Sequence, residues 1–168
     1  MMSELKWEGR FLTVRQQGSW EYAERKGEIG AAVIVALDGE DIILVEQYRI
    51  PVGKRCLELP AGLVGDESAG ESTAEAARRE LEEETGYRAD TVEDLGLFYS
   101  SPGMTSESFT VVRATGLVRV GDGGGSPEED ITVHRVPLAS VPGFLREKRA
   151  EGLGIDAKIL LLLDLAAL

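Results

Sequence analysis

Three consecutive glutamates, Glu82, Glu83 and Glu84, stand near the end of a predicted helix in the stretch "RRELEEETGY" (78–87). Gly86 follows two residues later, and glycine commonly ends a helix in the left-handed backbone conformation. The glutamates therefore lie in the last helical turn, at the negative end of the helix dipole, where carboxylates are unfavourable. Because carboxylates at this end of a helix lower its stability, we expect that they have a chemical role.

Glu80, Glu83 and Glu84 also share one side of this helix, because residues three and four positions apart are neighbours on a helical surface. Glu80 and Glu84 form a like-charged pair at that spacing, which destabilises a helix by roughly 0.2–0.5 kcal/mol. Arg79 could pair with Glu83, although an arginine that precedes its partner is in the weaker orientation. One interpretation is therefore a solvated charged face.

A metal site is the second interpretation of the same carboxylates. Clustered carboxylate oxygens bind hard cations, and Mg²⁺ prefers oxygen ligands while it retains several waters. Two such ions a few Å apart can hold a phosphate oxygen and activate a water. The helix by itself leaves both interpretations open.

The composition limits the substrates and partners of such a site. The 168-residue chain carries a formal net charge of −12, which disfavours nucleic acid and also repels a free polyphosphate. An acidic protein that handles phosphates therefore needs a divalent cation or local arginines. No run approaches the roughly 20 apolar residues of a membrane helix, and the first ten residues lack the apolar segment of a secretory signal. Cys56 is the only cysteine, so we expect a cytoplasmic protein without disulfides and without membrane or nucleic-acid partners.

Strands and helices alternate along the chain, and no internal repeat is present. Ser72 and Glu75 match a capping box at the start of the glutamate helix. The apolar run "AAVIVAL" (31–37) is typical of a strand buried on both faces, and Asp38-Gly39 predicts a hairpin turn after it. Local hairpins mixed with helices favour the α/β or the α+β class with a mixed sheet, rather than a doubly wound parallel sheet. Other strands are expected at 11–14, 20–25, 42–48, 57–62, 91–99, 108–114 and 131–137, and other helices at 141–151 and from Asp156 onward.

From Gly65 to Tyr87, the residue types and their spacing match one particular sequence motif. This spacing resembles the Nudix box, G-x5-E-x7-R-E-U-x-E-E-x-G-U, in which U is a bulky apolar residue. Every fixed letter is present, and Tyr87 occupies the final apolar slot. The matching residues are Gly65, Glu71, Arg79, Glu80, Leu81, Glu83, Glu84 and Gly86.

The resemblance to Nudix hydrolases implies a fold and a cofactor. The fold would be an α/β/α sandwich around a mixed sheet, with an N-terminal antiparallel strand segment (1–27) before the Nudix hydrolase domain (28–168). Most members hydrolyse a nucleoside diphosphate linked to another group, and they depend on Mg²⁺ or on Mn²⁺ as a substitute.

The resemblance also assigns roles within the box. Glu80 and Glu84 would be the main metal ligands, and Glu83 would assist them. Arg79 would orient the glutamates through a salt bridge. Glu71 would contribute to the metal site indirectly, through a neighbouring residue or a bridging water. The two box glycines would be structural.

Three stretches outside the box resemble the ADP-ribose pyrophosphatase subfamily, namely "VEQYR" (45–49), "LELPAGL" (57–63) and "SSPGMTSE" (100–107). Pro102 lies 16 residues beyond Gly86, where ADP-ribose hydrolases of this superfamily carry a proline. "GIDAKIL" (154–160) is similar to the same group. This resemblance would make the Ala61 carbonyl a metal ligand. It also assigns substrate contacts to several polar residues, for each of which the alternative is an ordinary surface or strand-edge position. The implied substrate contacts are Arg25, Arg49, Glu58, Met104 and Glu107.

Trp7 and Trp20 are the only tryptophans, and both lie in the N-terminal segment. Packing is the common role of tryptophan. The resemblance instead implies that this segment exchanges between the subunits of a homodimer. Trp20 would then stack on the adenine, together with the partner's Trp7.

The general base is expected in "GGGSPEEDI" (123–131), because its glycines supply mobility and Glu128 and Glu129 supply carboxylates. A solvated turn is the alternative. By resemblance, the glutamate just before Asp130 approaches the metals. This selects Glu129 as base and as a further metal ligand, with Glu128 in reserve.

These observations together predict a homodimeric, Mg²⁺-dependent ADP-ribose pyrophosphatase that forms AMP and ribose 5-phosphate. A Nudix hydrolase of another nucleoside-diphosphate sugar, such as GDP-mannose, is the nearest alternative. A non-catalytic nucleotide-sugar sensor is the second, and the intact box disfavours it.

Overall fold

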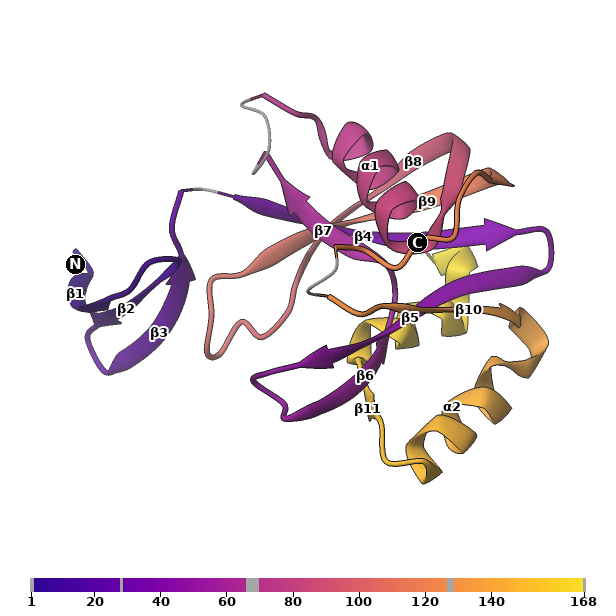
Figure 1. Ribbon diagram of the computed structural model, residues 1–168. Coiled ribbons are helices and arrows are strands. Elements are labelled where there is room, and N and C mark those ends of the chain that lie inside the picture. Colours follow the sequence, from indigo (N-terminus) through magenta and orange to yellow (C-terminus); the bar gives the residue numbers. More distant parts are fainter. Residues whose placement is uncertain (1, 28, 66–69, 127–128, 168) are drawn as a thin grey trace.

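The computed structural model describes residues 2–27, 29–65, 70–126 and 129–167, with side chains up to residue 162. These residues form a three-stranded antiparallel sheet, an eight-stranded mixed sheet and the helices around it (Figure 1). The small sheet contains β1 (Glu4–Glu8), β2 (Leu12–Gln17) and β3 (Trp20–Arg25). The large sheet contains β4 (Gly30–Asp38), β5 (Asp41–Arg49), β6 (Lys54–Glu58), β7 (Ala61–Val64), β8 (Tyr87–Tyr99), β9 (Ser108–Arg119), β10 (Thr132–Pro137) and β11 (Gly154–Ile155). The helices are α1 (Thr73–Thr85), α2 (Val141–Ala150) and the 3-10 helices η1 (Leu138–Ser140) and η2 (Ala157–Ala167).

Strand β4 is the centre of the large sheet. It pairs in parallel with β9 and antiparallel with β5 and β7, so the predicted mixed sheet is confirmed. The strand order is β11-β6-β5-β4-β9-β8, and β10 pairs with β5. Val33 and Val35 of β4 face one hydrophobic core while Ala32 and Ile34 face the other, because successive side chains of a strand point to opposite faces.

A helix layer covers each face of this sheet (Figure 1). Ala77 and Leu81 of α1 pack into the core that contains Ile34. Val141 of α2 and Ile159 of η2 pack into the opposite core. The arrangement confirms the predicted α/β/α sandwich.

The segment predicted as one strand at 57–62 is two strands, and that prediction is wrong. Residues 54–58 pair with β5, whereas residues 61–64 pair with β4. Pro60 lies between them and has no N–H for a ladder, while its carbonyl accepts a hydrogen bond from Ile34 N–H at 2.8 Å. The break turns the chain toward α1, where the glutamates lie.

Other element boundaries also differ from the sequence-based ones. Strand β1 was not expected, and its antiparallel pairing with β2 explains why such a polar segment is extended. Strands β8 and β9 are longer than expected because their hairpin ladder continues to the pair Tyr87 and Arg119. Over the described residues, no helix combines the length and the apolar character that crossing a membrane requires.

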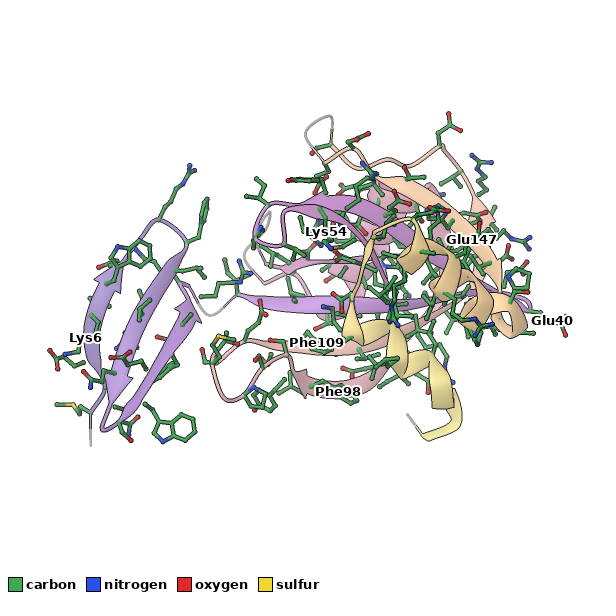
Figure 2. The ribbon with its side chains drawn as sticks, turned by 90° about the horizontal axis from the view of Figure 1, so that it is seen from below. Lys6, Glu40, Lys54, Phe98, Phe109 and Glu147 are labelled. Carbon is green, nitrogen blue, oxygen red and sulfur yellow. The ribbon has the colours of Figure 1, made fainter. Side chains whose placement is uncertain are left out.

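The small sheet stands to one side of the main body in both views (Figures 1 and 2). Figure 2 places Lys6 on this sheet and Phe98 and Phe109 on neighbouring strands of the large one, where their rings stack with centroids 6.1 Å apart. Ala23 of β3 connects the two parts, since its N–H donates to the Met104 carbonyl at 3.0 Å and its carbonyl accepts from Ser106 N–H at 3.1 Å.

Three basic side chains surround the carboxylate of Glu46 on β5. Arg55 donates to it at 2.7 Å, His134 Nε2 lies 3.0 Å away and Lys148 Nζ lies 3.6 Å away. Burial raises the pKa of Glu46, but the hydrogen bonds with Arg55 and His134 and the charge of Lys148 outweigh it, so the pKa lies below its ordinary value. Glu46 therefore ties β5, β6, β10 and α2 together as an anion.

Glu46→Gln should destabilise the protein more at neutral pH than in acid. A carboxyl whose pKa is lowered by folding stabilises the fold above its unfolded pKa, and this stabilisation is lost as pH falls through the folded pKa. We expect a loss of about 2 kcal/mol in unfolding free energy at pH 7 and a smaller loss near pH 3, measured by urea unfolding. Glu93→Gln, which removes the partner of Arg113 at a half-exposed site, should cost less than about 0.5 kcal/mol. An equal loss at both pH values would exclude the Glu46 charge as its source.

Candidate functional site

The ends of α1 are fixed by the residues that the sequence indicates. Ser72 and Glu75 form the complete capping box, and Gly86 ends the helix with a φ of 73°. A Cβ at Gly86 would overlap the backbone of Gly121, and one at Gly123 would overlap the carbonyl group of Thr85. The C-terminus of α1 is therefore in direct backbone contact with the glycine-rich loop.

Two glycines of this loop donate to the end of α1. Gly124 N–H bonds to the Glu84 carbonyl at 2.8 Å, and Gly125 N–H bonds to the Glu83 carbonyl at 3.0 Å. The last carbonyls of a helix lack partners within the helix, and the loop supplies them. The glycines, predicted to provide mobility, here provide close approach, and the loop that carries Glu129 is thereby placed beside the glutamates.

Arg79 holds three glutamates of the box at once. Its guanidinium donates to Glu71 at 3.0 Å, to Glu80 at 2.9 Å and to Glu83 at 3.4 Å. Glu71 also accepts a hydrogen bond from Gly65 N–H at 3.1 Å, which ties Glu71 to the residue that follows β7. The predicted pairing of Arg79 with Glu83 is present, and the stronger contacts are to Glu71 and Glu80.

Glu84 is the most deeply buried carboxylate of α1, at 4% exposure. Its Oε2 accepts a hydrogen bond from Ala61 N–H at 3.1 Å. Burial raises the pKa of Glu84 to about 8; the Ala61 hydrogen bond opposes this rise, and the charges of Glu80 and Glu129 add to it. A buried carboxylate beside two others attracts a cation.

A cavity of about 410 Å³ opens in front of these carboxylates. Most of the sequence-predicted site residues line it, namely Arg25, Arg49, Glu58, Ala61, Glu80, Glu84, Glu107 and Glu129. Arg79 and Glu83 are not among the lining residues, and Glu128 falls outside the described residues. Gln47 and Lys158 also line the cavity, although sequence reasoning did not select them.

Three cationic side chains face the cavity, each beside a carboxylate. Arg49 binds Glu58 through two hydrogen bonds of 2.8 Å. Arg25 lies 3.3 Å from Glu107, and Lys158 lies 2.5 Å from Asp156. Lys158 is the only charged residue in the apolar run 157–163, and that contrast is the signal that could have identified it.

The predicted aromatic contacts lie outside this cavity. Trp20 lines a second cavity of about 560 Å³, between the β2–β3 turn and the loop that contains Pro102. The side chain of Met104 is exposed, and Trp7 lies exposed on β1. Within one chain, therefore, these three residues are not brought together with the glutamates.

The carboxylates of the cavity offer oxygen ligands that a divalent cation could use. Over the part of the chain that the structure describes, no three acidic, His or Cys side chains are already grouped around one metal position. Glu80 is engaged by Arg79, Glu84 by Ala61 N–H, and Glu129 by Ser126 N–H at 2.7 Å. The donors are nevertheless all oxygen, and the buried charge of Glu84 has no basic side chain bonded to it among the described residues. This set fits a hard divalent cation.

The match to a family model places the chain in a known class. The NUDIX domain model matches residues 28–155, so the chain belongs to the Nudix family, whose hydrolases generally use divalent metal cations.

Among its relatives, the ADP-ribose pyrophosphatase of Mycobacterium tuberculosis is 44% identical over 112 residues, which cover 66% of this chain and 53% of that protein. The GDP-mannose pyrophosphatase of Cronobacter sakazakii is 29% identical over 148 residues, covering 83% of this chain and 73% of that protein. A crystal structure of an ADP compounds hydrolase has a TM-score of 0.69 at 26% identity, covering 87% of this chain and 81% of that one. Several curated relatives are matched over only 56% to 64% of their length.

Gly62→Ala should weaken divalent-cation binding without unfolding the protein. Gly62 has no positive φ, but a Cβ there would overlap the carboxylate of Glu80 and displace it from the cavity. A ligand that binds only the folded state raises Tm, so we expect the MgCl2-induced rise in Tm to fall to less than about half. Gly30→Ala is the matched control, because Gly30 lies on the neighbouring strand and a Cβ there meets open space. Equal cation-induced shifts in the two variants would contradict the role of Glu80.

Proposed function

We propose that this chain hydrolyses the diphosphate of a nucleoside-diphosphate sugar, with ADP-ribose as substrate and Mg²⁺ or Mn²⁺ as cofactor. The observation that carries the proposal is that one cavity brings the box glutamates Glu80 and Glu84 together with Glu129 and three cationic side chains. The carboxylates suit metal ions, and Arg25, Arg49 and Lys158 suit the oxygens of a diphosphate. The similarity to an ADP-ribose pyrophosphatase supports the choice of substrate.

Each wall of the cavity has a part in the proposed reaction. Glu80 and Glu84 would hold the cation, the Ala61 carbonyl would assist, and Arg79 would keep Glu80 and Glu83 oriented. A bound divalent cation neutralises phosphate charge and acidifies a bound water. Glu58 fixes Arg49 through Nε and Nη2, which leaves Nη1 for a phosphate oxygen.

Glu129 would accept the proton of the attacking water, after its carboxylate releases Ser126 N–H. The water oxygen bonds to one phosphorus, and the bond from that phosphorus to the bridging oxygen breaks. The products are AMP and ribose 5-phosphate.

GDP-mannose is the second candidate substrate. The similarity to a GDP-mannose pyrophosphatase is lower in identity but extends over more of the chain. The same acidic and cationic walls would serve either diphosphate, so the choice depends on the groups that contact the base and the sugar.

Incubation with ADP-ribose and MgCl2 should release AMP and ribose 5-phosphate, detected by chromatography, and EDTA should abolish the reaction. Glu84→Gln should lower kcat at least about 100-fold, because it removes the most buried candidate ligand. Glu82→Gln is the matched control in the same helical turn, since Glu82 pairs with Arg88 on the surface. Turnover of GDP-mannose alone would transfer the proposal to that substrate, and turnover of neither would favour a sensor.

We also propose that the chain forms a homodimer in which residues 1–27 exchange between subunits. The small sheet exposes several large apolar side chains that a second copy would cover: Leu5, Trp7, Phe11, Leu12 and Trp20. In such a dimer, Trp20 would stack on the adenine with the partner's Trp7, while Met104, Arg25 and Glu107 border the same substrate.

Trp20→Ala should raise the KM for ADP-ribose about 10-fold while kcat changes less than about threefold, because stacking binds the base without touching the diphosphate. Light scattering should give the mass of a dimer for the wild type. Tyr99→Ala, at another exposed aromatic, is the control and should leave KM unchanged. An unchanged KM in Trp20→Ala would exclude stacking, and a monomeric mass would exclude the exchange.

A further inference from the structure

Asp130 has an unusual backbone conformation directly beside the proposed base. Its φ of 48° makes it the one non-glycine residue with positive φ in the described part of the chain. Aspartate tolerates this region better than most residues, yet the conformation still costs roughly 1 kcal/mol. Such a conformation persists only where surrounding contacts hold it. The backbone conformation of Asp130 in turn sets the orientation of the preceding residue, Glu129.

Arg55 supplies those contacts from a strand 75 residues away in sequence. Its Nη1 donates to the Asp130 carboxylate at 3.0 Å, and its Nη2 donates to the Asp130 carbonyl at 3.0 Å. The same Nη2 lies 3.3 Å from Thr132 Oγ1, at the start of β10. One planar guanidinium thus holds both the side chain and the backbone of Asp130. It therefore fixes the backbone conformation of Asp130, besides neutralising the charge of its carboxylate.

The guanidinium of Arg55 is itself immobilised. Its Nε donates to the Glu46 carboxylate at 2.7 Å, and its Nη2 lies 3.0 Å from the Glu46 carbonyl. Glu46 is held in turn by His134 and Lys148. A flexible side chain fixed at both ends acts as a rigid connector between the sheet and the loop.

The other end of the loop is anchored to α1 through Gly124 and Gly125. Ile131 N–H donates to the Gly124 carbonyl at 3.2 Å, which brings the two ends of the loop together. Glu129 N–H donates to the Ser126 carbonyl at 3.0 Å, so the backbone of Glu129 is held as well. The placement of Glu129 therefore depends on one anchor at the glutamate helix and one at Arg55.

We propose that Arg55 is a positioning residue that aims Glu129 at the carboxylate cavity by holding Asp130 in its left-handed conformation. The inference rests on the role of Glu129 in the proposed function. Arg55 does not line the cavity, and it contacts the loop at Asp130, the residue after Glu129.

Arg135 offers a matched comparison on the same strand as Thr132. It also joins β10 to aspartates, at 2.9 Å from Asp38 and 2.6 Å from Asp41, but at the end of β10 remote from the loop. Loss of an arginine–aspartate pair is therefore common to both variants, and only Arg55, on β6, contacts the residue after Glu129.

Arg55→Met should lower kcat about 10- to 100-fold, since a displacement of about 1 Å at a reacting group can cost that much, while KM changes less than about threefold. The kcat of Arg55→Lys should fall between those of Arg55→Met and the wild type. The kcat of Arg135→Met should stay within about twofold of the wild type. Asp130→Gly should also lower kcat while Tm is kept, because glycine removes the carboxylate without backbone strain and leaves the pair of Arg55 with Glu46 intact.

A double-mutant cycle separates positioning from general damage to the fold. In a Glu129→Gln background, Arg55→Met should lower kcat less than about threefold further, because the group that it aims is already disabled. Multiplicative losses would overturn the inference, as would a kcat in Arg55→Met or Asp130→Gly no lower than in Arg135→Met. Full kcat in Glu129→Gln alone would overturn the role of Glu129, and the positioning role with it.

Amide hydrogen exchange tests the same connection without turnover. Arg55→Met should speed exchange at the N–H groups of Glu129 and Ile131 at least about 10-fold relative to the wild type, and Arg135→Met should not. Unchanged exchange would overturn the inference even if ADP-ribose is hydrolysed. Faster exchange in a protein that cleaves no nucleotide sugar would instead place the failure in the proposed function.

Discussion

The burial of a carboxylate among other carboxylates is the constraint on which the site depends. Glu84 lies in the interior with Glu80 and Glu129 nearby, and burial raises its pKa to about 8. A flexible scaffold would relieve this repulsion by letting the side chains separate into water. The caps of α1 and the guanidinium of Arg79 prevent that, because they fix both the helix ends and the glutamate orientations. The small residues Ala76 and Ala77 let α1 approach the sheet closely.

Backbone contacts, rather than side chains, bring the loop to this helix. Gly86 and Gly123 leave no space for a Cβ between α1 and the loop, and the loop amides occupy the free carbonyls at the end of the helix. The negative end of a helix dipole is unfavourable for glutamates, and hydrogen bonds from loop N–H groups offset part of that cost. A glycine-rich composition can therefore indicate tight packing as well as mobility.

Local signals in the sequence predicted the parts of the site that local geometry determines. The capping box, the C-cap glycine and the spacing of the glutamates lie within one helix, so their positions follow from helical periodicity. The two-faced burial of β4 also followed from its unbroken apolar run. The strand break at Pro60, the place of Lys158 and the contact between Arg55 and Asp130 did not, because each depends on which distant segments pair. Trp7, Trp20 and Met104 lie outside the cavity of one chain.

Glu46 and Glu84 show how environment separates a glutamate that stabilises the fold from a candidate metal ligand. Both are buried, at 9% and 4% exposure, and both lie in the main body. Arg55, His134 and Lys148 surround Glu46, and its pKa is lowered, so it is a satisfied anion that stabilises the fold. Glu84 accepts a hydrogen bond from a backbone N–H and lies near two like charges, so its pKa is raised, and among the described residues no basic side chain is bonded to it. Sequence periodicity cannot distinguish these two cases, since the partners of each come from other elements. Arg55 joins the two environments, because the residue that compensates Glu46 also holds the loop that carries the third carboxylate to Glu84.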